Sequence, residues 1–182
     1  MRTPRAWISA CLLPLLSLCL LFFGCSRPAA AFTVDGLAVE KAELIHYMRE
    51  YSAVAAAALE NQGLDSTRDD FWTTTQNGVD TFAYLKDYTT QQLVRLKVEQ
   101  QCAKKQGVDT PLYYSDQLEA WHEQNRQRAS AYAAGEVLYG PVERDFIAYF
   151  QEWYLEMEQQ SMTALYENGT LSVSVSEEET VY

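Results

Sequence analysis

Apolar side chains recur at helical spacing in four separate segments of the chain. These segments cover residues 38–62, 80–106, 115–134 and 141–167. An apolar residue at every third or fourth position places those side chains on one face of a helix, where they can pack against a neighbour. The pattern therefore predicts a mainly α-helical chain with four long helices.

Each predicted helix has one apolar face that should turn toward the core. In chain order, these faces consist of Leu44, Met48, Tyr51, Ala55 and Leu59; of Phe82, Leu85, Leu93, Leu96 and Ala103; of Leu118, Trp121 and Tyr132; and of Phe146, Phe150, Trp153, Met157 and Leu165.

Residues with capping preferences mark the predicted helix ends. Asp80 is the expected N-cap of the second helix, and Gly63, Gly107 and Asn168-Gly169 stand where helices should stop. Pro141 fits the first turn of the fourth helix. Helices of more than twenty residues span about 35–40 Å, which is longer than a compact bundle of this size needs. We therefore expect an extended packing of the helices that leaves a groove.

Two short segments outside the helices favour β-structure. Phe32-Thr33-Val34 precedes the turn pair Asp35-Gly36, and residues 171–175 alternate apolar with polar side chains, as a half-buried strand does. Residues 64–79 are polar and are predicted to form a connection, which Phe71-Trp72 would fasten to the core.

The amino-terminal end has the pattern of a secretion signal. Arg2 and Arg5 precede an almost uncharged run that ends at Gly24. This run is a poor candidate for a membrane-spanning helix, which needs about 20 apolar residues, because Pro14 interrupts it. We therefore predict that residues 1–24 are a signal peptide and that the protein leaves the cytoplasm.

The cysteine behind this run is a candidate lipid attachment site. Gly24-Cys25 after a leucine- and phenylalanine-rich core resembles a bacterial lipobox, in which diacylglycerol is added to the thiol and the preceding residues are removed. Cys25 would then anchor the protein to the extracytoplasmic face of the cell membrane, with residues 25–31 as a tether. The alternative is cleavage after Ala31, which would release a secreted protein.

The chain is acidic, with 14 Lys and Arg against 25 Asp and Glu and a net charge of −11. Loss of residues 1–24 would remove two arginines and leave a net charge near −13. Such a field repels nucleic acid and anionic bilayers, so no nucleic-acid partner is expected and the membrane would be reached through the lipid. The same charge would favour basic polypeptides.

The sequence contains no recognised catalytic motif. It lacks a G-x-S-x-G elbow, an H-E-x-x-H pair and a P-loop. Both of its histidines, His46 and His122, fall within predicted helices and are expected to be half-buried or surface residues rather than catalysts. Cys102 would have no disulfide partner after lipidation of Cys25, and we expect it to be a small buried side chain. No catalytic or cofactor-binding residue is predicted.

Three aspartates in the connection invite comparison with a calcium site. Asp65, Asp69 and Asp70 lack the glycine and the glutamate that an EF-hand loop requires at its sixth and twelfth positions. We expect them to cap turns and to be solvated, and no metal ligand is predicted.

Three stretches form a further pattern through their order and spacing. They are Val34-Asp-Gly-Leu-Ala-Val39-Glu-Lys-Ala-Glu43-Leu44, the segment from Leu93 that ends in Ala103-Lys-Lys-Gln-Gly107-Val108, and Gly135-Glu-Val-Leu-Tyr-Gly140-Pro141. Together they resemble the N-terminal domain of SurA/PrsA-type chaperones, or foldases, over residues 32–182. Asp35, Val39 and Leu44 depart from the asparagine, isoleucine and phenylalanine that are usual in that family.

The resemblance implies an extended, trigger-factor-like arrangement of helices that binds peptides. It also implies a small β pairing of residues 32–34 with residues 171–175. The parvulin-type prolyl isomerase domain of that family has no counterpart in this chain, so isomerase activity is not expected. The function implied is an exported, lipid-anchored chaperone-like module that binds unfolded or partly folded secreted proteins without catalysis. The alternatives are a structural or interaction lipoprotein without client binding and a truncated peptidyl-prolyl isomerase foldase.

Overall fold

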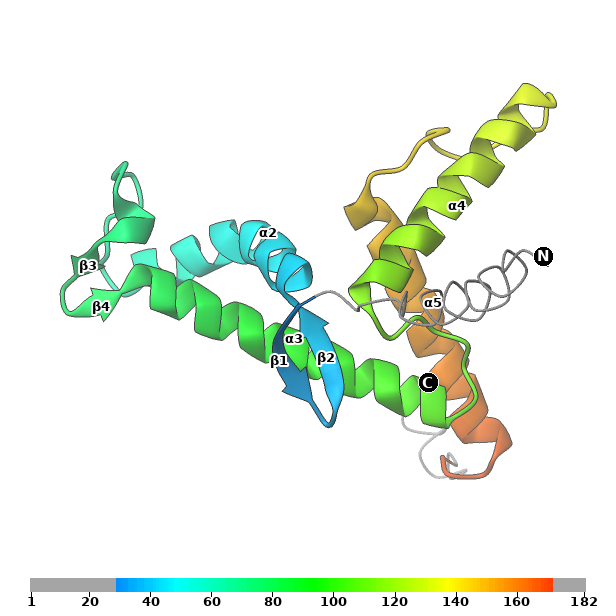
Figure 1. The fold of residues 1–182 in the computed structure, drawn as a ribbon, viewed down its shortest axis with the longest axis horizontal. Coiled ribbons are helices and arrows are strands. Elements are labelled where there is room, and N and C mark those ends of the chain that lie inside the picture. Colours follow the sequence, from blue (N-terminus) through cyan, green and yellow to red (C-terminus); the bar gives the residue numbers. More distant parts are fainter. Residues whose placement is uncertain (1–28, 172–182) are drawn as a thin grey trace, which may run out of the picture.

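The computed structural model describes residues 29–171, which form a mainly helical and extended molecule (Figure 1). Its four helices are α2 (Lys41–Glu60), α3 (Thr81–Lys105), α4 (Tyr114–Ala133) and α5 (Phe146–Glu167). Two antiparallel strand pairs complete it: β1 (Ala30–Val34) with β2 (Leu37–Glu40), and β3 (Thr75–Gln76) with β4 (Val79–Asp80). The predicted fold class, mainly helical with a small β pairing, is confirmed. The signal peptide and Cys25 lie outside the described residues.

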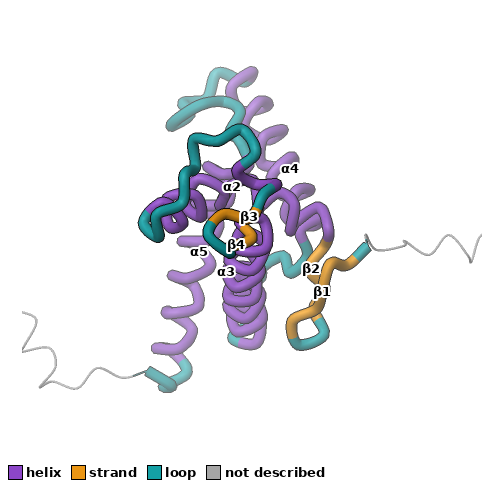
Figure 2. Tube along the Cα trace, turned by 90° about the vertical axis from the view of Figure 1, so that its left-hand side faces the viewer, coloured by secondary structure: helices purple, strands orange, loops and turns teal. Residues whose placement is uncertain are grey.

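Helices α2 and α3 run antiparallel and form one arm of the molecule, whereas α4 and α5 project away from the opposite end of α3 (Figure 1). With 25 residues, α3 is the longest element and is about 37 Å long at 1.5 Å per residue. Viewed along α3, the β1–β2 hairpin lies on one side of it and α5 on the other (Figure 2). The long helices therefore make a branched shape rather than a closed bundle.

The predicted helix ends are largely confirmed, but α5 and α2 start later than predicted. Asp80 caps α3 by accepting a hydrogen bond of 2.9 Å from the backbone amide of Ala83. Gly63 and Gly107 follow α2 and α3 with φ angles of +84° and +89°, which glycine adopts without strain. Helix α5 begins at Phe146 and not near Pro141, and Asp145 is its N-cap.

The segment before α5 is held in an extended path by side chains of α4. The carbonyl oxygen of Arg144 accepts hydrogen bonds from Trp121 Nε1 at 2.8 Å and from Asn125 Nδ2 at 2.9 Å. Arg128 donates to the carbonyl oxygens of Tyr139 and Pro141. A helix starting at Pro141 would use the carbonyls of Pro141 and Arg144 internally, and their bonds to α4 side chains explain the late start.

The first helix also starts later than predicted, because residues 37–40 form strand β2. Asp35 and Gly36 both have positive φ, 49° and 81°, and make the two-residue turn that joins β1 to β2. Within the described residues, β1 pairs with β2 alone. Leu171 is not in a strand, and the rest of the predicted partner, 172–175, lies outside the described residues.

The core is divided into four clusters along the molecule. The central cluster joins the hairpin, α2, α3 and α5, and its buried members are Val34, Val39, Tyr47, Leu93 and Leu96. A second cluster at the far end of the arm contains Leu59, Leu64 and Phe71, with Trp72 packed against it. Two further clusters join α5 to the end of α3 and to the start of α4. Phe71-Trp72 does fasten the connection, as predicted.

Three side chains predicted to be buried are exposed. Phe82 is 51% exposed and Tyr132 is 64% exposed, and Cys102 is also exposed. Phe82 and Cys102 each lie one position away from the inward face of α3, which is about 100° around the helix. That face instead includes polar side chains, namely Thr81, Thr89, Lys97 and Gln100. Tyr132 is in the last turn of α4, whereas the cluster with α5 involves the first two turns of α4.

Candidate functional site

An apolar groove opens along one side of the α2–α3 arm. It has a volume of about 430 Å³. Its lining residues come from α2, from α3 and from the short 3₁₀ helix η2 (Phe71–Thr73), and they are Ile45, Met48, Arg49, Ser52, Trp72, Phe82 and Leu85. We call this feature the α2–α3 groove.

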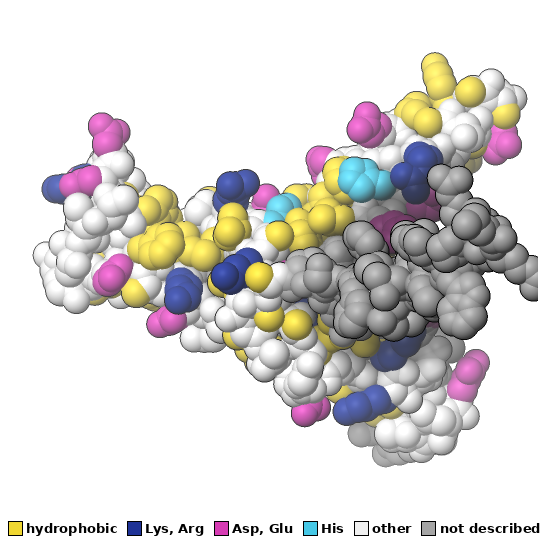
Figure 3. Space-filling model, viewed as in Figure 1, with side chains coloured by type: hydrophobic (Ala, Val, Ile, Leu, Met, Phe, Trp, Pro, Cys, Tyr) yellow, Lys and Arg dark blue, Asp and Glu magenta, His cyan; other side chains and the backbone are white. Residues whose placement is uncertain are grey.

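The groove exists because two helices cannot cover the whole apolar surface that each presents. Helices α2 and α3 contact each other through Tyr51 and Tyr88, whose ring centroids are 5.6 Å apart, and through the distal cluster. Ile45 and Phe82 stand beside this contact and remain 52% and 51% exposed, because no third helix covers them. Figure 3 shows hydrophobic side chains gathered over this arm. A contiguous exposed apolar surface is typical of an interaction site.

Trp72 lines the groove and is held in place by its neighbours. Its ring packs against the buried ring of Phe71 at a centroid distance of 4.6 Å. The hydroxyl of Thr81, which is itself buried, donates a hydrogen bond to the carbonyl oxygen of Phe71. Gln76 and Asp65 exchange two hydrogen bonds across the connection. The position of Trp72 is therefore set by the fold before anything binds.

Two of the three aspartates of the connection, Asp65 and Asp70, act in local structure, as predicted. Asp65 accepts hydrogen bonds from the backbone amide and the hydroxyl of Thr67, which lower the pKa of its carboxyl. Asp70 forms an ion pair with Arg68 at 2.9 Å, which lowers the pKa of Asp70. Within residues 29–171, no group of three or more histidine, cysteine or acidic side chains is placed to hold a metal ion.

A buried ion pair joins the base of the arm to the rest of the molecule. Glu43 Oε1 and Lys97 Nζ are 2.8 Å apart, and both side chains are fully buried. Lys97 also donates a hydrogen bond of 2.8 Å to the carbonyl oxygen of Leu112, in the loop between α3 and α4. Burial raises the pKa of Glu43, and the charge of Lys97 opposes this effect.

Further polar contacts extend from this pair into α4. Glu40 accepts hydrogen bonds from the amide and the hydroxyl of Ser115, at 3.2 and 2.8 Å. Gln100 donates to the carbonyl oxygen of Pro111 at 2.9 Å. We call Glu40, Glu43, Lys97, Gln100 and Ser115 the polar junction. Because its charged groups are enclosed by protein, it has the character of a structural link between α2, α3 and α4.

Sequence reasoning missed the polar junction, although one signal was present. Lys97 follows Leu93 by four residues and Leu96 by one, so it falls within the inward stripe of α3 rather than on its solvent face. A lysine at such a position requires a partner if it is to be buried.

The two histidines lie where they were expected on the helices. His46 is half-buried, with its ring 5.0 Å from Phe146 and 5.7 Å from Tyr114, and burial lowers its pKa. His122 is exposed and its ring lies 4.4 Å from that of Trp121. These placements agree with the half-buried and surface positions that were predicted for them.

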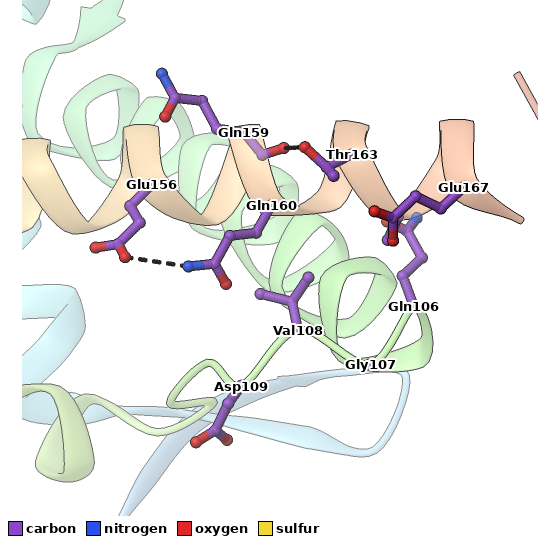
Figure 4. Close-up of a pocket in the computed structure, with 10 residues that line it drawn as sticks. Gln106, Gly107, Val108, Asp109, Glu156, Gln159, Gln160, Thr163 and Glu167 are labelled. Atoms are coloured by element: carbon purple, nitrogen blue, oxygen red, sulfur yellow. Dashed lines mark hydrogen bonds between the residues drawn. The ribbon is translucent and has the colours of Figure 1, made fainter.

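A second hollow lies between the end of α3 and the second half of α5 (Figure 4). It has a volume of about 560 Å³, and most of its lining is polar. Gln160 donates a hydrogen bond to Glu156 at 3.1 Å, and Thr163 donates to the carbonyl oxygen of Gln159 at 3.0 Å. These groups are exposed and bonded within their own helix. Apolar contact, the main source of affinity for unfolded chains, is therefore offered by the α2–α3 groove and not by this hollow.

No helix within residues 29–171 combines the length and the hydropathy needed to cross a membrane.

Comparison with known proteins gave no match to a family model, to a curated protein or to a solved structure. The likeness to SurA/PrsA-type chaperones consequently stays a prediction that depends on the three sequence stretches.

Proposed function

We propose that this chain is an exported, lipid-anchored, chaperone-like module that holds unfolded or partly folded polypeptides in the α2–α3 groove, without catalysis. The observation that supports this proposal is the open apolar groove, in which Ile45 and Phe82 are half exposed beside Met48 and Trp72. Export and anchoring rest on the amino-terminal pattern and on Cys25.

The composition of the groove suits clients of varied sequence. Met48 has an adaptable, polarizable side chain, and Trp72 offers a large apolar surface. Burial of one large apolar side chain contributes about 1.5–3 kcal/mol, and association itself costs several kcal/mol. A groove with room for one or two such side chains therefore binds weakly and reversibly, which is appropriate for a protein that must release its clients.

We predict that replacing Ile45 and Phe82 together by serine abolishes most of the holding activity. The variant loses the two most exposed apolar side chains of the groove. The molar excess of this protein over the client that gives half-maximal protection should therefore rise by about fivefold or more. The measurement is light scattering from a client protein that aggregates when its disulfides are reduced.

The matched control replaces Val137 and Tyr139 by serine. These residues are 84% and 87% exposed and lie between α4 and α5, away from the groove. The control should protect the client as well as the unaltered protein does, and circular dichroism should show all three proteins equally helical. If the unaltered protein gives no protection at several-fold molar excess, or if both variants behave alike, the proposal is wrong. Tight capture of one partner without affinity for unfolded peptides would instead indicate an interaction lipoprotein.

A further inference from the structure

The α2–α3 groove differs in charge from the molecule that contains it. Its seven lining residues include one charged side chain, Arg49, and no carboxylate. Each of four other hollows in the described part of the chain is lined by at least two acidic residues. A chain with a net charge of −11 therefore has a groove that is locally cationic.

Three exposed cations surround the apolar lining of the groove. On α2, Lys41 and Arg49 lie four residues before and after Ile45, so all three share one face of the helix. On α3, Lys86 follows Phe82 by four residues and lies beside it in the same way. Figure 3 shows Lys and Arg side chains next to the hydrophobic side chains of the arm.

These cations are not neutralised by ion pairs. The six ion pairs formed within residues 29–171 involve neither Lys41, Arg49 nor Lys86. Glu50 and Asp87 are exposed neighbours in sequence, but each is about 100° further around its helix and neither lines the groove. The cationic groups are therefore available to a bound polypeptide.

We propose that the groove selects polypeptide segments in which a large apolar side chain has aspartate or glutamate within a few residues. This inference rests on the proposed function and specifies its client class. The apolar side chain contacts Met48, Trp72 and Phe82, while a carboxylate meets the guanidinium of Arg49, which can donate two parallel hydrogen bonds to it. Net charge alone predicts the opposite preference, for basic clients. At physiological salt, charges more than about 8 Å away are largely screened, so the cations beside the groove decide the preference.

The test uses three labelled peptides of equal length that share the same apolar residues and differ in their flanks, which are acidic, neutral or basic. Fluorescence anisotropy with the full chain at about 0.15 M salt should rank affinities as acidic, then neutral, then basic. One or two partly exposed ion pairs correspond to a preference of about three- to tenfold for the acidic over the neutral peptide. Raising the salt to about 0.5 M should largely remove that preference.

A charge reversal separates the groove from the field of the whole protein. R49E should invert the ranking of the acidic and basic peptides, with each affinity expressed relative to that of the neutral peptide on the same variant, since interfacial charges contribute mainly to specificity. K105E makes the same change in net charge at the far end of α3 and should preserve the ranking. Equal binding of the three peptides, or a preference for the basic one, would overturn this inference while leaving the proposed function intact. If none of the peptides binds, the proposed function itself fails.

Discussion

Replacing Lys97 by methionine is expected to lower the free energy of unfolding by about 3–5 kcal/mol at pH 7, because it leaves the carboxylate of Glu43 buried without a counter-charge. Both side chains are fully buried and their charged atoms are 2.8 Å apart. The substitution also removes the donor to the carbonyl oxygen of Leu112. Urea denaturation followed by circular dichroism measures the loss.

The loss caused by K97M should shrink in acid. Burial holds the pKa of Glu43 above its ordinary value of 4.5, and removal of Lys97 takes away the charge that opposes this rise. A carboxyl group whose pKa is higher in the folded than in the unfolded state lowers the free energy of unfolding. This loss is complete at pH values above the folded-state pKa and disappears at pH values below the unfolded-state pKa. Variant and unaltered protein should therefore approach each other in stability as the pH falls from about 7 to about 4. A loss below about 1 kcal/mol at pH 7, or one independent of pH, would show that the pair is not buried as described.

A double substitution separates the missing charge from the missing side chain. Replacing Glu43 by leucine together with Lys97 by methionine removes both charges and keeps similar volumes, so most of the stability lost in K97M should return. If the double variant is no more stable than K97M, the hydrogen bonds of the polar junction rather than the unpaired charge account for the loss.

Replacing Leu93 by alanine should lower the free energy of unfolding by about 2–5 kcal/mol, because the shorter side chain leaves a cavity in the central cluster. Leu93 is 1% exposed and packs where the hairpin, α2, α3 and α5 meet. The next residue, Val94, is 38% exposed, and its replacement by alanine should cost less than about 1 kcal/mol. Urea denaturation of the two variants compares adjacent positions of one helix. Equal losses would contradict the orientation of α3.

The helices were predictable because their periodicity and their stop signals agree. Asp80, Gly63 and Gly107 mark ends through local chemistry that does not depend on the rest of the fold. The start of α5 was not predictable in this way, since carbonyls before Asp145 are bound by side chains of α4 that are distant in sequence. Strand β2 was missed because it ends at Glu40 and α2 begins at the next residue, Lys41, with no glycine or proline between them to mark the boundary.

A groove between extended helices was predicted from the sequence, but its position between α2 and α3 was not. Periodicity identified Phe82 as part of an apolar stripe, but it does not say which edge of a wide stripe a neighbouring helix will cover. The burial of Lys97 was missed because its partner Glu43 and its acceptor, the carbonyl oxygen of Leu112, come from other elements. Both errors concern tertiary contacts, which the local pattern does not contain.

Whether unfolded polypeptide enters the α2–α3 groove is tested most directly by NMR of the isoleucine and methionine methyl groups. Ile45 and Met48 line the groove, whereas Ile147 and Met157 lie on α5 and serve as internal controls. On titration with an unfolded client peptide, the methyl signals of Ile45 and Met48 should shift together while those of Ile147 and Met157 stay in place. Saturating peptide that moves the α5 signals and leaves Ile45 and Met48 unchanged would contradict binding in the groove.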